Sequence, residues 1–302
     1  MEAYIGLLRT PLGLVFLVLL FALEDYLLRR TERRGYDCKE SAATLGVSVG
    51  QIVLRGSSLW LLQPVFAWAY ANRLMTVETL NLFWVAVLFV MVEFFYYWFH
   101  RLSHTIRWMW ATHAVHHSSE NFNFSAAFRL GWTGTLSGNW LFFLPMMFFG
   151  FPPMTVVAAF GANLTFQLFL HTRLIGQLGF LEGWLNTPSA HRVHHGANEP
   201  YLDKNFGGVT LVFDRLFGTY QPELREVPIR YGLIVPLRSH NPFWIALHEW
   251  AGMARDGMAL LFREDRAGAP RVPLIGIEGD AAVPPGAQSG ASETNTKRAM
   301  TA

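Results

Sequence analysis

The sequence predicts an all-α integral membrane protein with four or five transmembrane helices, including a helical hairpin, and a cytoplasmic, histidine-rich helical cap. Two observations predict this class. Of the 302 residues, 52% are hydrophobic and 15% are charged, whereas soluble domains carry roughly 25% charged residues. Nine of the eleven histidines fall in four tight groups, each just beyond a long apolar stretch. Lipid is therefore the expected solvent, with the polar chemistry gathered at one face.

Three apolar stretches precede the first histidine group and predict transmembrane helices. The first, residues 11–23, lacks a small-residue cleavage site, which indicates an anchor helix rather than a signal peptide. The second lies between Arg55 and Arg73 and is long enough if both arginines reach out to the interface. The third, residues 79–100, contains a single charged residue, Glu93.

A fourth apolar stretch, residues 130–170, holds no Asp, Glu, Lys or Arg. A bilayer core of about 30 Å needs about 20 helical residues, so this stretch is long enough for two crossings. The Gly-Phe-Pro-Pro string at residues 150–153 predicts the turn of a helical hairpin. The hairpin either spans twice or dips in and returns, and both alternatives put its two ends on the same side.

Basic residues set the expected orientation. The positive-inside rule places the segment after the first span in the cytoplasm. The residues concerned are Arg29, Arg30, Arg33, Arg34 and Lys39. Alternating spans then bring every histidine group to the cytoplasmic face. We therefore expect an integral protein of a bacterial inner membrane or the endoplasmic reticulum, with its histidine cluster on the cytoplasmic side.

The composition divides the chain into four regions. We expect an N-terminal transmembrane anchor (residues 1–78), a histidine-rich catalytic domain (79–235), an amphipathic C-terminal helix (236–265) and a disordered tail (266–302). The tail is rich in Gly, Pro, Ala, Ser and Thr, which cannot bury enough apolar surface to fold. The net charge of +2 is too small for a nucleic-acid surface, so no nucleic-acid partner is expected.

The histidines recur at helical spacing, which predicts metal ligands. His100 and His104 are four residues apart, and the pattern His-x-x-His-His begins at His113 and again at His191, so each set of rings projects from one helix face. One ion takes four to six ligands, so eight or nine imidazoles are about right for two ions. The predicted ligands are His100, His104, His113, His116, His117, His171, His191, His194 and His195.

The ligand types narrow the chemistry. The single Cys38 excludes a cysteine-held cluster, and the His-Glu-x-x-His string of zinc proteases does not occur. A histidine-rich pair of irons beside a lipid-accessible cavity suits dioxygen activation and attack on an unactivated C–H bond. A lipid desaturase with the same centre is one alternative. A histidine-lined membrane metal transporter or sensor is another, although histidines at the ends of the spans favour catalysis.

Four further residues are candidates for orienting the ligands: Glu93, Asp203, Asn205 and Asp214. A carboxylate just after the third motif is placed to accept a hydrogen bond from the second nitrogen of a ligand ring. For Asp203, Asn205 and Asp214 the alternative is turn and capping chemistry around Gly207. Glu93 lies within a span, where a carboxylate is costly, so it is expected to face the site or to pair with an arginine.

The order of the histidine motifs after paired apolar spans resembles the fatty acid hydroxylase / sterol desaturase superfamily. The string NTPSAHRVHHGANEPYLDKNFGGVTLVFDRLFGTY, residues 186–220, is similar to its C-terminal signature. The Phe-Leu-His-Thr segment at residues 169–172 and the His-Arg-Val-His-His-Gly run are most similar to the alkylglycerol monooxygenase-like branch. The resemblance covers about residues 85–235. It departs at Ala190, where some relatives carry a further histidine.

The resemblance implies a membrane-bound oxygenase with O2 as co-substrate and a lipid substrate that is fatty acyl, alkylglycerol or sterol-like. It also implies that the nine histidines hold two iron ions, with zinc as the alternative in purified samples. The sequence contains no haem or ferredoxin module. Electrons are therefore expected from an external donor of the cytochrome b5, ferredoxin or pterin type, and from a tetrahydropterin if the narrower resemblance holds.

Overall fold

The computed structural model describes residues 10–261, apart from the side chains of residues 55–59, 260 and 261. Over this range the chain is helical, with two isolated β-bridges and no longer strand. The α-helices are α2 (Pro11–Thr31), α3 (Cys38–Ala71), α4 (Leu82–Thr105), α5 (Arg107–His117), α6 (Leu144–Phe149), α7 (Pro153–Leu168), α8 (Pro188–His194), α9 (Val212–Phe217) and α10 (Pro242–Leu261). Short 3-10 helices are η1 (Phe124–Phe128), η2 (Asn139–Phe143) and η3 (Gly179–Leu181). The predicted all-α class is confirmed for the described residues, and the expected disordered tail lies outside them.

Two helices, α2 and α4, are long and apolar enough to cross a membrane. The side chain of Thr10 caps α2 by accepting a hydrogen bond from the Gly13 amide, and Asn81 caps α4 in the same way through Phe83. Only 22% of the apolar window of α2 and 28% of that of α4 is buried. A core helix of a soluble protein would bury most of this surface, so both helices fit a membrane protein.

The second expected span is part of a longer helix than the sequence suggested. α3 runs unbroken for 34 residues, starting after Asp37, whose side chain accepts a hydrogen bond from the Glu40 amide. Its C-terminal half contains the stretch predicted to cross the membrane. α3 is long enough to cross a membrane, but its described residues contain no stretch as apolar as those of α2 and α4, so its crossing stays a prediction.

Only part of the fourth apolar stretch forms a helical hairpin: residues 139–149 and 153–168 are helical, whereas residues 132–138 form turns. α6 ends at Phe149, and α7 begins at Pro153, so the turn lies where the Gly-Phe-Pro-Pro string indicated. Gly150 has φ 141°, and a Cβ there would lie 2.4 Å from the carbonyl oxygen of Met75. Only glycine fits this close approach. The 16 residues of α7 extend about 24 Å, less than the bilayer core of about 30 Å.

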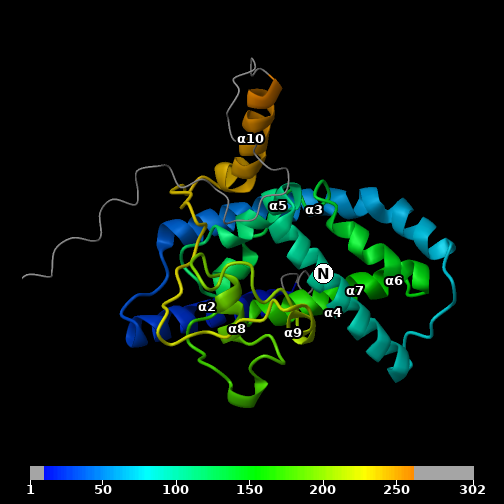
Figure 1. Ribbon diagram of the computed structural model, residues 1–302, viewed down its shortest axis with the longest axis horizontal. Helices are drawn as coiled ribbons and strands as arrows, with labels where there is room; N and C mark the ends of the chain where they lie inside the picture. The colour runs from blue at the N-terminus through cyan, green and yellow to red at the C-terminus, as the bar shows by residue number, and fades with distance from the viewer. Residues whose placement is uncertain (1–9, 262–302) are drawn as a thin grey trace, which may run out of the picture.

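The helices build an apolar core at one end of α4 and leave its other end for the histidines. In Figure 1, α3 runs along one edge of the molecule, α4 crosses the body, and α6 and α7 lie between them. Their contact is a cluster of buried side chains that includes Phe66 of α3, Val92 of α4, Met146 of α6 and Phe160 of α7. His100 and His104 lie at the opposite, C-terminal end of α4.

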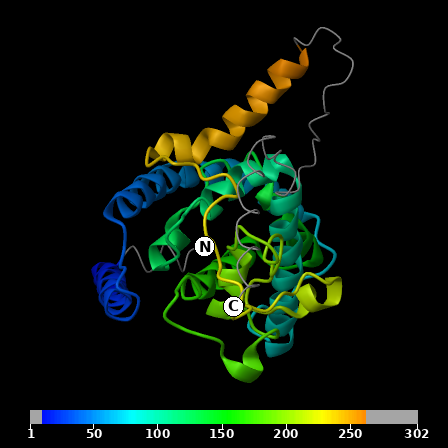
Figure 2. The same cartoon turned by 60° about the vertical axis from the view of Figure 1, so that its left-hand side comes forward.

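The expected C-terminal helix is present as α10, which projects from the body in both views (Figures 1 and 2). Its base packs against α3 and α5. An ion pair joins Arg107 of α5 to Asp256 of α10 at 2.6 Å, and the indole nitrogen of Trp250 donates a hydrogen bond to the Thr133 hydroxyl at 2.9 Å. α10 is therefore anchored both to the start of α5 and to the segment that follows the α5 histidines.

Candidate metal centre

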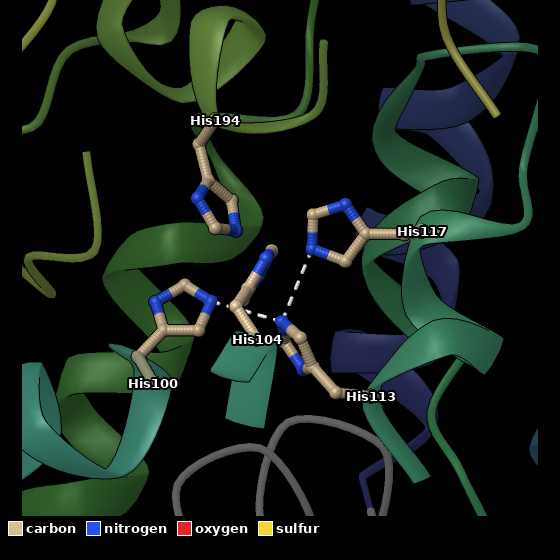
Figure 3. A group of neighbouring side chains, drawn as sticks. All are labelled: His100, His104, His113, His117 and His194. Carbon is tan, nitrogen blue, oxygen red and sulfur yellow. Dashed lines mark hydrogen bonds between the residues drawn. The ribbon is translucent and has the colours of Figure 1, made fainter. Parts of the chain in front are cut away.

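All nine predicted histidines converge into two adjacent groups. Within each group, one ring nitrogen per residue lies within 4.8 Å of every other. The five-histidine group consists of His100, His104, His113, His117 and His194 (Figure 3). The four-histidine group consists of His116, His171, His191 and His195. Two clusters of this size fit two metal ions with four to six ligands each.

The two His-x-x-His-His motifs divide their rings between the groups. In both motifs the first and last histidines, which are four residues apart, belong to the same group. His113 and His117 belong to the five-histidine group, and His191 and His195 to the four-histidine group. The middle histidine of each motif, His116 or His194, joins the other group. Neighbouring helix positions lie about 100° apart, whereas positions four apart differ by only about 40°. Each motif therefore contributes to both groups and holds them side by side.

The ring nitrogens of the five-histidine group point toward one another (Figure 3). Nε2 of His113 lies 3.0 Å from Nε2 of His100 and 3.1 Å from Nε2 of His117. Nitrogen ligands about 2.1 Å from one ion, at angles between 90° and tetrahedral, lie about 3.0 to 3.4 Å apart. The three rings are therefore spaced as ligands of one ion would be.

The four-histidine group has the same spacing. Nε2 of His171 lies 3.2 Å from Nε2 of His116 and 3.1 Å from Nε2 of His191. His171 follows directly after α7, whereas His191 belongs to α8 and His116 to α5. Three separate elements thus bring their nitrogens to one point, which a single helix motif does not achieve.

Several buried ring nitrogens have no hydrogen-bond partner among the described residues. They include Nε2 of His104, His194 and His195, as well as Nδ1 of His116 and His191. A buried polar atom left unpaired costs about 1–3 kcal/mol, so such atoms are rare unless a ligand completes them. Three of these nitrogens are Nε2 atoms of the two groups, and a metal ion would give each of them a partner.

Acceptor oxygens fix the proton of several rings on Nδ1. A carbonyl oxygen can only accept, so the ring nitrogen that meets it must carry the proton, and Nε2 keeps its lone pair for a metal. Such carbonyl contacts orient metal-binding histidines. The carbonyl acceptors are Phe206 for His100 at 2.9 Å, Gln167 for His171 at 2.8 Å and Lys204 for His194 at 2.9 Å.

Burial keeps the rings neutral, which is the form that binds metals. It lowers the pKa of the His116 ring to about 4. For the other rings outside α4, burial lowers the pKa well below its usual value, with neighbouring imidazoles adding to the effect for all six. These rings are His113, His117, His171, His191, His194 and His195.

The candidate orienting residues after the third motif behave differently from one another. Asp203 accepts from a ligand ring, with its Oδ1 3.1 Å from Nδ1 of His104. Asn205 instead joins the Ala190 carbonyl to the backbone of residue 221, in a left-handed conformation with φ 57°. Asp214 accepts from the amides of residues 206 and 207 at 2.7 and 2.8 Å. Asn205 and Asp214 therefore stabilise turns, which was the alternative role considered for them. Asp214 contacts none of the described ligand rings, and it influences His100 indirectly, by holding residue 206, whose carbonyl orients that ring.

Glu93 takes neither of its two expected roles. Among the described residues its carboxylate contacts no histidine and no arginine. It accepts hydrogen bonds from the amide of Thr210 at 2.6 Å, the amide of Val209 at 3.1 Å and the side chain of Asn163 at 2.7 Å. The cost of a buried carboxylate is met by these donors. Glu93 thus fixes the loop before α9 to α4 and α7.

Sequence reasoning missed Glu40, which holds the segment directly after the α5 histidines. Its carboxylate accepts from the Ser119 hydroxyl at 2.7 Å, the Glu120 amide at 2.8 Å and the Asn121 side chain at 2.6 Å. It also pairs with the buried Arg129 at 3.2 Å. No local sequence pattern predicts this role, because Glu40 is about 80 residues away from its partners along the chain.

Sequence reasoning also missed Arg192, although a signal was present. This arginine stands inside the second His-x-x-His-His motif and is buried. It pairs with Glu223 at 2.7 Å and donates to the carbonyls of Thr172 and Ile175 at 3.0 and 2.7 Å. It therefore fastens α8 to the segment after His171. A charged residue between predicted buried ligands is itself buried and needs a partner, and this would have indicated an ion pair that joins two segments.

A cavity of about 210 Å³ lies beside both groups. His100 and His113 of the five-histidine group line it, as do His116 and His171 of the four-histidine group. Apolar side chains of α3, η2 and α7 line its far end, among them Leu62, Phe66, Phe143 and Phe160. Of the described residues that line it, none is Asp, Glu, Lys or Arg. An uncharged, largely apolar molecule could therefore lie against both groups.

Comparison with known proteins agrees with this geometry. Residues 85–219 match the fatty acid hydroxylase family. The chain is 43% identical to alkylglycerol monooxygenase of Xenopus tropicalis over 159 residues, which is 53% of this chain and 35% of that protein. It is 42% identical to alkylglycerol monooxygenase of Homo sapiens over 160 residues, again 53% and 35% of the two chains.

A bacterial relative is more distant. Ornithine lipid hydroxylase OlsE of Rhizobium tropici is 31% identical over 139 residues, which is 46% of this chain and 42% of that protein. The chain thus matches less than half the length of each of these relatives. No solved structure matches the chain. All nine histidines lie within residues 85–219, the segment that matches the fatty acid hydroxylase family, and the chain is similar to alkylglycerol monooxygenases over about half of its length.

Proposed function

We propose that the protein is a membrane-bound di-iron oxygenase that hydroxylates a lipid at an unactivated C–H bond, using O2 and external electrons. The observation that carries this proposal is the cavity, which is lined by apolar helices and also by histidines of both groups. The names of the relatives, alkylglycerol monooxygenase and ornithine lipid hydroxylase, support lipid hydroxylation.

The two histidine groups fit one ion each. Their Nε2 atoms are spaced as ligands of an ion, several have no hydrogen-bond partner in the described part of the chain, and burial keeps the rings unprotonated. Iron bound there would supply the activation of dioxygen. The protein's own part is to hold the rings in one tautomer through Asp203 and the carbonyls described above, and to keep water from the reacting carbon.

The apolar end of the cavity fits a hydrocarbon chain. Leu62 and Phe66 of α3 face Phe143 of η2 and Phe160 of α7, with the rings of Phe143 and Phe160 4.3 Å apart. The hydroxyl of Tyr96, which also lines the cavity, is already bonded to Gln167 at 2.9 Å. A buried alkyl chain would therefore meet satisfied polar groups and apolar side chains on its way to the histidines.

The membrane arrangement extends this proposal. α2 and α4 would cross the bilayer, with the C-terminal half of α3 as a further span. The short α6–α7 hairpin favours the alternative in which the fourth stretch dips in and returns. The histidines then lie at the cytoplasmic face, where an external donor of the cytochrome b5, ferredoxin or pterin type would deliver electrons.

Labelled oxygen tests the function. The full chain, loaded with ferrous iron in lipid nanodiscs, is given an alkylglycerol, a chemical reductant or tetrahydropterin, and ¹⁸O2. We expect product with one ¹⁸O atom by mass spectrometry, and no product after the iron is removed with a chelator. A product that has lost two hydrogens without gaining ¹⁸O would overturn hydroxylation in favour of desaturation. No product with any donor, tried also on fatty acyl and sterol lipids, would contradict the proposal.

A further inference from the structure

One end of the cavity carries uncharged polar side chains among apolar ones, and none of the described residues that line it is Asp, Glu, Lys or Arg. Thr112 of α5, which directly precedes His113, lines this end with Ser137 and Asn139. Gln51 of α3 lies there too, because its neighbour Gly50 packs against Trp132, which precedes Ser137 in the same segment. Along α3 this end is about 16 Å from Leu62, where the apolar end begins. The cavity is therefore amphipathic, with the histidines alongside.

A chain of hydrogen bonds runs through the hydroxyls at this end. The indole nitrogen of Trp250 donates to Thr133 at 2.9 Å, and the hydroxyls of Thr133 and Thr112 are 2.6 Å apart. Thr112 also contacts the hydroxyl of Ser137, which donates to the Trp108 carbonyl at 3.4 Å. The two ends of the chain are thus groups of fixed character, because an indole nitrogen only donates and a carbonyl only accepts.

The donor at one end and the acceptor at the other determine which hydroxyl donates in each hydrogen bond between them. Thr133 accepts from Trp250 and donates to Thr112, Thr112 donates to Ser137, and Ser137 donates to the carbonyl. Each hydroxyl has one proton and two lone pairs. All three protons are therefore used, whereas each oxygen keeps one lone pair. Of these oxygens, those of Thr112 and Ser137 belong to residues that line the cavity.

We propose that Thr112 and Ser137 form a hydroxyl site that recognises the polar end of the lipid by accepting a hydrogen bond from it. The headgroup it takes is uncharged, because none of the described lining residues would neutralise a phosphate or an ammonium group, and it carries a free hydroxyl. An ether or ester oxygen offers no proton and finds none here. This inference rests on the proposed function, because it concerns how the same cavity holds its lipid.

A matched pair of lipids tests the hydroxyl site. 1-O-hexadecylglycerol and its doubly O-methylated form share the alkyl chain and the ether oxygen, but only the first donates hydrogen bonds. Equilibrium binding to the iron-loaded full chain in nanodiscs is measured by displacement of the radiolabelled free form, under anaerobic conditions so that no lipid is consumed. We expect the free form to bind about 10-fold more tightly than the methylated form, as one or two net hydrogen bonds allow.

Two variants and one control separate recognition from structure. Thr112→Val and Ser137→Ala are each expected to reduce the preference to about 2-fold or less, mainly by weakening binding of the free form. Thr135→Val is the control, because Thr135 lines the same cavity from the same segment but its hydroxyl is not part of the chain. It is expected to keep the wild-type preference. Iron content is measured for every variant, so that loss of the metal centre is not read as loss of recognition.

Wild-type protein that binds both lipids equally would overturn the hydroxyl site. So would a Thr112→Val or Ser137→Ala variant that retains both iron and the full preference, or a Thr135→Val variant that loses the preference as the other two do. None of these results bears on whether the protein oxygenates lipids. That proposal fails separately, by the absence of ¹⁸O-labelled product from wild-type protein.

Discussion

His117→Ala and His194→Ala are each expected to abolish lipid product while leaving membrane insertion intact. Both rings belong to the five-histidine group, and Nε2 of His194 has no hydrogen-bond partner within residues 10–261. Removal of one imidazole leaves the remaining buried nitrogens without a complete metal site. Product is measured by mass spectrometry, and insertion by recovery of the full chain in the membrane fraction after alkaline washing.

A matched control is His240→Ala, because His240 is exposed and belongs to neither group. It is expected to keep wild-type product. His195→Ala extends the test to the four-histidine group and is expected to behave like His117→Ala. Retained product in any of the three group variants would count against the assignment of that ring as a ligand.

Glu40→Ala is expected to lower the free energy of unfolding by about 3 kcal/mol or more. The side chain of Arg129 is 3% exposed and that of Glu40 is 12% exposed, and loss of one partner of a buried ion pair costs about 3–5 kcal/mol. The change also removes the acceptor for Ser119 and Asn121. Unfolding is followed by denaturant titration in detergent micelles, with iron content measured in parallel.

The Glu40→Ala/Arg129→Ala double variant tests the reason for this loss. It is expected to be less destabilised than the sum of the single variants, because the guanidinium is no longer left unpaired. Glu78→Ala is the control for loss of an exposed carboxylate and is expected to change stability by less than about 0.5 kcal/mol. A Glu40→Ala variant as stable as this control would contradict the role assigned to Glu40.

The sequence predicted the set of histidines that converge but not how they divide. Spacing of four residues showed that His113 and His117 share a face, and the structure keeps them together. The prediction from sequence placed His116 on the same face, although neighbouring helix positions differ by about 100°. That angle sends His116 to the other group. Helix periodicity alone is enough to predict this division. The position of His171, which follows a different helix, depends on how the helices pack and was not predictable in this way.

The groups that orient the ligands were mostly beyond prediction, for a physical reason. Three of the four Nδ1 acceptors described above are backbone carbonyls, and every residue has one, so residue type carries no signal. Asp203 was predictable because it is a carboxylate close to a ligand motif. Glu93 was noticed for its cost in an apolar helix, but its donors are amides of a loop far along the chain.

The fold was predicted best where local chemistry dictates the backbone. The hairpin turn at residues 150–153 followed from glycine and proline, which restrict φ directly. The length of α3 was missed, because Arg55 was treated as the edge of a membrane segment. A charged residue ends an apolar window but does not end a helix, and α3 continues through it for 34 residues.

The number of metal ions per chain shows whether the nine imidazoles build two metal sites. The full chain is purified from cells grown with iron, dialysed extensively and analysed by inductively coupled plasma mass spectrometry against protein concentration. Two tightly held ions per chain are expected, because five and four nitrogens converge at two points. One ion per chain, or ions lost on dialysis as a transporter would lose them, would contradict the account.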